Sequence, residues 1–111
     1  MSEELRDPHK AVDYILSNAG RYAKAKAERV YLEEFRKSKK ALLMAQSEAK
    51  TSAEREQWAY GHGDYLKLLD GIRTAIEIEE GLKWGLEAAR IRVDIWRSQE
   101  ASNRTMDRSA A

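Results

Sequence analysis

The side chains that could perform acid–base or metal chemistry are few and scattered. His9 and His62 lie far apart in the sequence, and neither has a second imidazole or a carboxylate at a convincing metal-ligand spacing. Glu77, Glu79 and Glu80 form a short acidic cluster, but consecutive residues of a helix point to different faces and do not pair as acid and base. The sequence therefore predicts a protein that is not an enzyme, with no catalytic residues, no metal ligands and no cofactor.

Basic side chains are the better candidates for ligand contacts. Residues 21–40 hold eight Lys and Arg residues against three Glu residues, and five of the eight fall close to one helical face. Such a positive strip suits phosphate groups, although charge runs are also typical of solvated faces. The predicted nucleic-acid contacts on this strip are Lys26, Arg29, Arg36, Lys37 and Lys40. A second set, Arg97 and Arg104, follows near the other end of the chain.

Three aromatic residues crowd the predicted turn before the last long helix. Exposed aromatic rings beside Lys and Arg can stack on the bases of single-stranded DNA, and Trp58, Tyr60 and Tyr65 are placed for this. Alternatively, Trp58 and Tyr65 close the end of a helical hairpin as core residues, which the burial habits of these residue types favour. His62, in the Gly-flanked turn between them, is expected to be solvated.

The other segments of the chain are expected to pack against a long helix from Asp64 to about Ala101, which therefore positions the basic and aromatic residues. Its apolar seam has alternating spacings of three and four, which is typical of a helix that lies along another helix. The seam consists of Tyr65, Leu68, Ile72, Ala75, Glu79, Leu82, Leu86, Ala89, Val93 and Trp96. Because a single helix cannot bury its own seam, we predict helix-packing and oligomer contacts at Ile72, Leu82, Leu86, Val93 and Trp96.

Two features of this helix call for neighbours of particular kinds. Glu79 occupies a seam position, where a carboxylate either fixes the register against a cation or marks a wet layer. Gly81 and Gly85 would let a second backbone approach closely. Trp84 belongs to a further apolar stripe, completed by Ile91 and Ile95. So wide an apolar surface predicts more than one neighbour, inside the protomer or across an oligomer.

The remaining segments predict an all-α fold. Asp7 is a candidate N-cap, with Pro8 at the first position of a short helix that ends or bends at residues 18–20. A second helix is expected over residues 21–50, with Lys39 on its apolar face extending its amine to water. A short helix over 54–60 follows a cap in residues 51–54, and Asp64 is predicted to cap the long helix. The result is a long antiparallel helical hairpin with a short N-terminal helix, oligomerising through apolar helix faces.

Length and composition limit the class of protein. The 111 residues predict a single helical domain over 1–111, with 1–6 and 102–111 flexible. The chain has no Cys, which excludes disulfides and fits a reducing compartment. The polar start does not resemble a signal peptide, and no apolar run reaches the roughly 20 residues of a membrane span. We therefore expect a cytoplasmic protein without a membrane partner.

Two segments resemble short helical proteins that many tailed phages encode. These are residues 25–40, Ala-Lys-Ala-Glu-Arg-Val-Tyr-Leu-Glu-Glu-Phe-Arg-Lys-Ser-Lys-Lys, and residues 90–101, Arg-Ile-Arg-Val-Asp-Ile-Trp-Arg-Ser-Gln-Glu-Ala. The layout, a basic helix, a break and a long helix with an apolar seam, is similar to recombination mediators of the UvsY type.

This resemblance implies a homo-oligomer in the host-cell cytoplasm that binds single-stranded DNA. It also implies two protein partners, since such a mediator helps a recombinase displace the single-strand-binding protein. The net charge of +1 departs from the pattern of a DNA binder. The alternative is a helical structural or adaptor oligomer of a phage with no nucleic-acid role.

Overall fold

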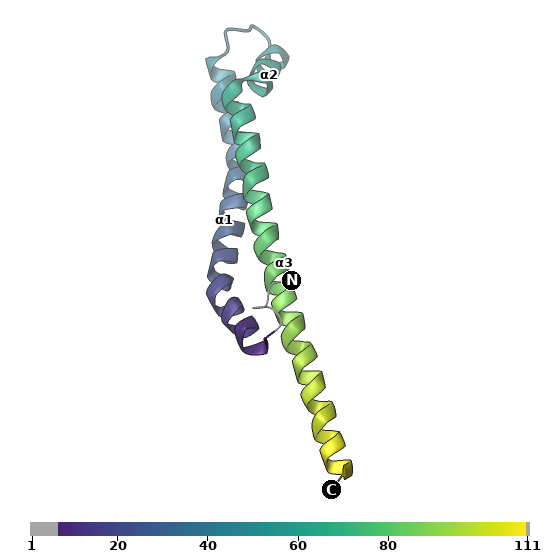
Figure 1. Ribbon diagram of the computed structural model, residues 1–111. Coiled ribbons are helices and arrows are strands. Elements are labelled where there is room, and N and C mark those ends of the chain that lie inside the picture. The colour runs from purple at the N-terminus through teal and green to yellow at the C-terminus, as the bar shows by residue number, and fades with distance from the viewer. Residues whose placement is uncertain (1–6, 111) are drawn as a thin grey trace. The chain divides into compact units, whose positions relative to one another are not determined.

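The computed structural model describes residues 7–110 and contains three helices (Figure 1). Helix α1 spans Pro8–Gln46, α2 spans Ser52–Gly61 and α3 spans Gly63–Ala110. No strand occurs in this part of the chain. The prediction of an all-α helical hairpin is confirmed.

Helix α1 begins where the sequence predicts and continues further than expected. The carboxylate oxygen Oδ1 of Asp7 accepts hydrogen bonds from the backbone N–H groups of His9 (2.8 Å) and Lys10 (3.4 Å), which makes it the N-cap. The helix does not end at residues 18–20, so the short N-terminal helix is the first part of α1. A single Gly costs an established helix only about 1 kcal/mol, and neighbouring turns maintain it. The predicted end at residue 50 is also wrong, since α1 ends at Gln46.

The connection between α1 and α2 uses the predicted cap. The hydroxyl of Thr51 accepts a hydrogen bond from the backbone N–H of Glu54 at 3.2 Å. Arg55, in the first turn of α2, returns its Nε–H to the carbonyl of Ala49 at 2.7 Å. Residues 54 and 55 of α2 thus hold the five-residue connection through hydrogen bonds to Thr51 and Ala49.

The cap of α3 differs from the prediction. Helix α3 starts at Gly63, and the backbone N–H of Asp64 donates to Nδ1 of His62 at 3.0 Å. Asp64 therefore lies in the first turn, while His62 supplies the acceptor that a helix start needs. The side chain of His62 is 30% exposed and its ring lies 5.0 Å from that of Trp58, so it is not the solvated turn residue we expected.

Helix α3 also extends past its expected end near Ala101. It remains helical to Ala110, with exposed side chains from residue 101 onward. The predicted loose segment 1–6 lies outside the described residues, and the flexibility expected for 102–111 stays a prediction.

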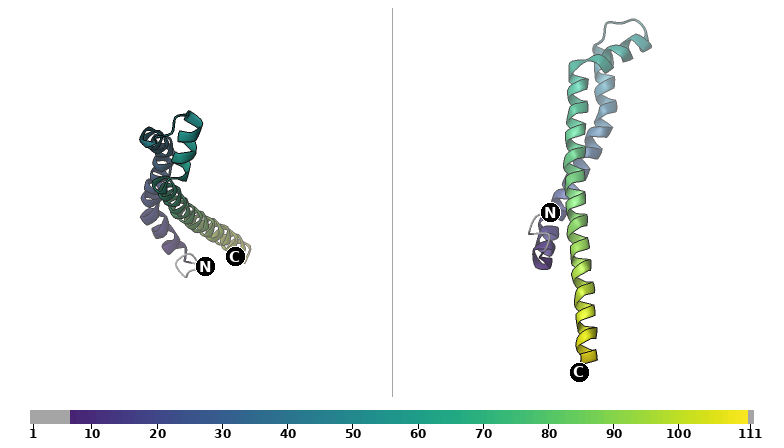
Figure 2. Two further views of the ribbon diagram at one scale, coloured as in Figure 1. Left: turned by 90° about the horizontal axis from the view of Figure 1, so that it is seen from above. Right: turned by 45° about the vertical axis from the view of Figure 1, so that its right-hand side comes forward.

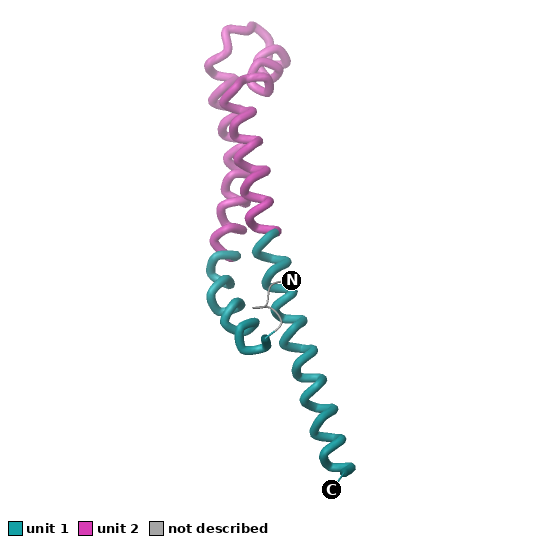
Figure 3. Tube along the Cα trace, viewed as in Figure 1, with its two compact units in different colours: residues 1–22, 81–111 teal, residues 23–80 magenta. Residues whose placement is uncertain are grey.

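Two compact units divide the chain (Figure 3). We call residues 23–80 the hairpin unit, and residues 1–22 with 81–111 the terminal unit. In each unit, a segment of α1 runs antiparallel to a segment of α3 (Figures 1 and 2). The hairpin unit also contains α2 and has a core of Leu43, Ala59 and Tyr65, with Met44 packed against it.

Candidate nucleic-acid interface

An ion pair connects the middle of α1 to α3 in the hairpin unit. Arg29 donates from Nε to Oε2 of Glu79 at 2.7 Å and from Nη2 to Oε1 at 2.9 Å. Its Nη1 donates to Glu33, one turn along α1, at 3.1 Å. Glu79 is only 6% exposed, so its charge needs this two-bond partner. Of the two alternatives for Glu79, the structure shows the one in which a cation fixes the register of the hairpin.

The same contacts change the role of Arg29. The two carboxylates raise the pKa of its guanidinium, chiefly through the hydrogen bonds with Glu79 and then those with Glu33. Three of its five N–H donors are engaged within the chain, and 25% of the side chain is exposed. A DNA phosphate would have to compete with two carboxylates. Sequence periodicity placed Arg29 on the basic strip, but the structure turns it toward α3.

Lys40 is also held by contacts within the hairpin unit. Its amine lies 3.4 Å from Oε1 of Glu56 and 5.0 Å from the centre of the Tyr60 ring. These groups raise the pKa of Lys40, with the hydrogen bond to Tyr60 the largest cause. Lys40 therefore ties α1 to α2. Nothing in the periodicity of α2 pointed to Glu56 as its partner.

Lys39 behaves as its place on the apolar face of α1 predicted. Its side chain is 26% exposed, and its amine extends to within 3.9 Å of Oδ2 of Asp64. The carboxylate that was expected to cap α3 thus faces a lysine of α1 instead.

Three of the five predicted strip residues face outward. Lys26, Arg36 and Lys37 are exposed on α1. Lys37 lies 3.4 Å from Glu34, but both side chains are at least 70% exposed, and such pairs contribute little. Within residues 7–110, Lys26 and Arg36 have no ion pair closer than 4.0 Å. We call these three residues the outward strip.

The aromatic residues of the hairpin unit divide between core and surface. Tyr65 is 7% exposed and meets the ring of Tyr60 edge-on at 5.3 Å, which confirms its predicted core position. Trp58 is 42% exposed, so the core interpretation is wrong for it. Its ring lines a surface hollow of about 410 Å³ together with residues 46–49. An exposed indole beside a hollow offers a base a stacking surface.

The arginines of the terminal unit differ in their pairing. Arg97 and Arg104 are exposed on α3, and the described residues give them no ion pair. Arg90 instead donates to Glu87 at 2.6 Å and to Asp94 at 2.9 Å, which holds the pKa of Glu87 below its usual value. The heptad spacing of these arginines therefore does not give them one role.

The apolar seam of α3 packs within the chain. Ile72 is buried in the hairpin unit. In the terminal unit, Leu82, Leu86 and Val93 are half-buried, and Trp96, 38% exposed, lies with its ring 6.4 Å from that of His9. Burial inside one protomer fits the predicted helix packing at Ile72, Leu82, Leu86 and Val93, whereas Trp96 is exposed. Their predicted role in joining copies stays untested.

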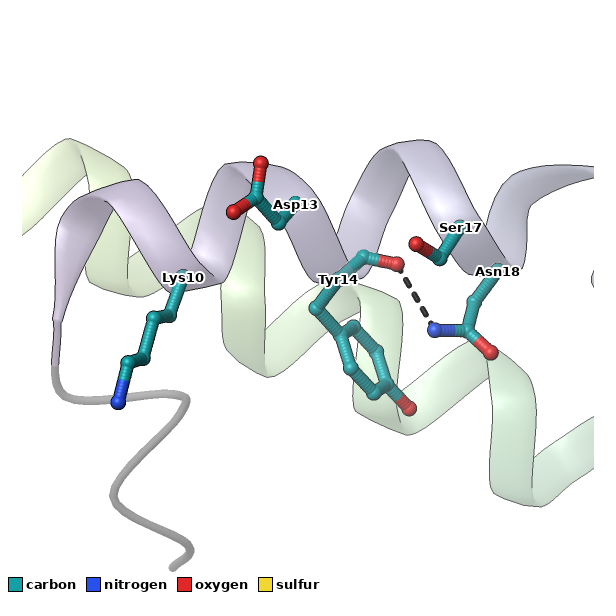
Figure 4. A pocket seen from close by; sticks show the side chains of 5 residues that line it. All are labelled: Lys10, Asp13, Tyr14, Ser17 and Asn18. Atoms are coloured by element: carbon teal, nitrogen blue, oxygen red, sulfur yellow. Dashed lines mark hydrogen bonds between the residues drawn. The ribbon is translucent and has the colours of Figure 1, made fainter.

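The glycines of α3 differ in what approaches them. Figure 4 shows the ring of Tyr14 pointing from α1 toward α3, beside the Asn18 side chain that donates to the Tyr14 carbonyl at 2.9 Å. A methyl group at Gly85 would lie 3.1 Å from Cζ of Tyr14 and closer still to its hydroxyl oxygen. Gly85 thus admits a tyrosine side chain, where we had predicted a backbone. An equivalent methyl group at Gly81 would meet nothing within 4 Å.

Residues 7–110 contain neither a metal-binding cluster nor a membrane-spanning helix. No group of three or more His, Asp or Glu side chains in this range could hold a metal ion. No described helix is long and apolar enough to cross a bilayer. Comparisons with protein-family models, curated proteins and solved structures found no match.

Proposed function

We propose that this chain is an accessory protein of DNA recombination, which binds single-stranded DNA through the outward strip and works as an oligomer. The observation that carries the proposal is the position of Lys26, Arg36 and Lys37, whose charged ends all face solvent on one helix. The resemblance of residues 25–40 and 90–101 to small phage proteins supports the recombination role. In that role the protein helps a recombinase displace the single-strand-binding protein.

The mechanism requires no reaction centre. Each protomer offers three outward cations, and three single-strand phosphate contacts give a log–log salt slope of about −2. So few contacts bind weakly, and the net charge of +1 adds little attraction at long range. Joining several copies repeats the strip along one strand and raises the affinity without new contacts. The exposed ring of Trp58 adds a stacking surface in the same unit.

A charge-reversal experiment tests the outward strip. The variant Lys26→Glu/Arg36→Glu/Lys37→Glu is compared with a control, Lys50→Glu/Lys67→Glu/Arg108→Glu, which changes the net charge equally at exposed positions away from the strip. Fluorescence anisotropy measures binding to a labelled thymidine oligonucleotide of about 30 nucleotides, long enough for several sites of usual size. We expect the strip variant to lose at least tenfold in affinity for the oligonucleotide and the control to lose less than about threefold.

Two results would contradict the DNA role. Equal losses of affinity in the two variants would show that the net charge of the chain alone attracts the oligonucleotide. No binding of the wild-type chain at low salt would exclude the interface altogether. Circular dichroism of each variant should give the same total helix content as the wild type.

A second candidate function is an adaptor or structural oligomer that binds no nucleic acid. It is favoured by the internal pairing of Arg29 and Lys40, which removes two of the five predicted phosphate contacts. It is also favoured by at least sixteen large apolar side chains of the described residues that are more than a third exposed. Self-association without any DNA binding at low salt would select this candidate.

A further inference from the structure

Helix α3 carries a second apolar stripe in the terminal unit. Gly81, Trp84, Ala88, Ile91 and Ile95 follow one another at spacings of three, four, three and four, which is the pattern of a helix-pairing seam. At 100° per residue, this stripe lies roughly 140° around the helix from the seam that contains Leu86 and Val93. A neighbour that packs on one stripe therefore leaves the other open. We call these five residues the outer stripe.

The outer stripe is exposed. Trp84 is 61% exposed, Ile91 45% and Ile95 43%, while Gly81 has open space around it. The indole alone presents on the order of 100 Å² of surface. With the two isoleucines, the exposed area amounts to a few hundred Å², the size at which an apolar patch marks an interaction site.

The sizes of its residues make the outer stripe complementary to itself. When two copies lie antiparallel about a two-fold axis, Trp84 of each can face Ala88 of the other, and Gly81 can face Ile91. Both of these layers pair a large side chain with a small one, and the two-fold axis repeats each of them, while Ile95 lies opposite Glu77 of the other copy. A parallel alignment would instead place Trp84 against Trp84 and leave a void between the two Gly81 residues.

The charged residues that border the outer stripe favour the parallel alignment, but more weakly than packing favours the antiparallel one. Glu87 borders the outer stripe and would approach Glu87 of an antiparallel copy, while Asp94 would lie about 24 Å along the axis from its own equivalent. Arg90 already binds both carboxylates, at 2.6 Å and 2.9 Å, which makes this edge less negative. Exposed charge pairs contribute little to the free energy of association, whereas burial of an indole contributes much more. Packing therefore decides the orientation.

We infer that the outer stripe binds the outer stripe of a second copy of this chain, with the two α3 helices antiparallel. The inference deepens the proposed function, because a repeated strip requires copies that are joined, but the contact itself needs no DNA. The small area predicts an interface at the weak end, with a dissociation constant on the order of micromolar.

The first test measures self-association of the full chain without DNA. Sedimentation velocity over about 1 to several hundred micromolar brackets the expected dissociation constant. We expect Trp84→Glu to weaken dimerisation at least about tenfold, because it removes the central aromatic residue of the contact. The matched control, Tyr31→Glu, changes another aromatic side chain of similar exposure, 62%, and should stay within about threefold. A wild-type chain that remains monomeric, or an equal effect of the two variants, would overturn the inference.

The second test determines the orientation, and the absence of native Cys makes it simple. In the antiparallel pair, residues 81 and 91 of different copies are opposite, while the two residues 81 are about 15 Å apart. A disulfide requires Cα atoms within about 7 Å. A mixture of Gly81→Cys and Ile91→Cys chains should therefore form the mixed disulfide on mild oxidation, and Gly81→Cys alone should form much less dimer. Equal cross-linking of Gly81→Cys alone would show a parallel pair and overturn the assignment.

The dimer proposal and the DNA proposal can be contradicted independently. Cross-linking is measured without oligonucleotide, so its result does not depend on the outward strip. If Trp84→Glu abolished dimers while the strip variant still showed its specific loss of DNA affinity, both proposals would stand. If neither variant differed from its control, both would fall.

Discussion

The two units achieve helix packing by different means. The hairpin unit has a fully buried leucine, Leu43, and a two-bond ion pair between Arg29 and Glu79. The terminal unit relies on size: Ala11 and Ala89 are fully buried, and the ring of Tyr14 fills the space that Gly85 leaves.

This difference shows which surface remains for partners. An ion pair specifies one register at some cost in desolvation, and in the hairpin unit it orients Arg29 and Glu79 inward. Small residues allow close packing in the terminal unit, where Trp84, Ile91 and Ile95 remain exposed. The outer stripe with Trp84 is the clearest case. The comparison predicts that substitutions of similar chemistry will have unequal effects.

The largest effect is expected at the core of the hairpin unit. Leu43→Ala should lower the free energy of unfolding by about 2–4 kcal/mol, because it removes buried methyl groups and leaves a cavity. Leu42→Ala is the matched control, since Leu42 is adjacent and 57% exposed, and it should change stability by less than about 0.5 kcal/mol. Urea denaturation followed by circular dichroism measures both. Similar losses in the two variants would show that the Leu43 cluster is not the core.

A smaller loss is expected when the ion pair is broken. Glu79→Ala leaves Arg29 without its main partner and should lower the melting temperature by roughly 5 °C or more. Glu77→Ala removes an exposed carboxylate from the same helix, with Arg73 at 3.7 Å, and should have little effect. If the contact sets the register, the exchange Arg29→Glu/Glu79→Arg should restore part of the loss. A double variant less stable than Glu79→Ala would contradict this explanation.

Glycine substitutions in the terminal unit should have opposite signs. Gly20→Ala places a methyl group in open space within α1 and should stabilise the chain by up to about 1 kcal/mol. Gly85→Ala gains the same helix propensity but displaces the Tyr14 ring, so we expect a net loss of up to about 1 kcal/mol. Tyr14→Phe removes the atom that would lie nearest the new methyl group, and it should recover part of this loss in the double variant. Thermal melts at low protein concentration decide the signs.

The smallest effect concerns the N-cap of the terminal unit. Hydrogen bonds from the backbone N–H groups of His9 and Lys10 lower the pKa of Asp7 below its ordinary value of 3.8. A folded pKa below the unfolded one gives stability that is complete above that ordinary value and is lost as the pH falls through the folded pKa. Asp7→Asn keeps the cap without this titration. Between pH 6 and pH 3 the wild type should therefore lose about a degree or two more in melting temperature than the variant. Equal losses would assign the acid effect to other carboxylates.

Local rules predicted the helices and several of their ends. The caps at Asp7 and Thr51 follow from residue types that accept hydrogen bonds from the first turn of a helix. The spacing of three and four predicted that Ile72 and Tyr65 would be buried. These predictions succeeded because the interactions involve residues within a few positions, or a pattern that repeats along one helix. The same rules failed at residues 18–20, where they predicted the end of a helix. A single Gly disfavours the helix less than the hydrogen-bonded helical turns on either side stabilise it.

The sequence by itself determined that the chain forms amphipathic helices with a seam, since periodicity and capping are local properties. For Glu79 it left two alternatives, a wet layer or a cation that fixes the register. Only the tertiary structure decided that this cation is Arg29, that Glu56 holds Lys40, and that Gly85 receives Tyr14. These pairs join residues far apart in the chain, and a helical face shared by five cations does not reveal which of them turn toward a neighbouring helix. Packing thereby reduced the predicted strip on α1 to Lys26, Arg36 and Lys37, and left the outer stripe exposed.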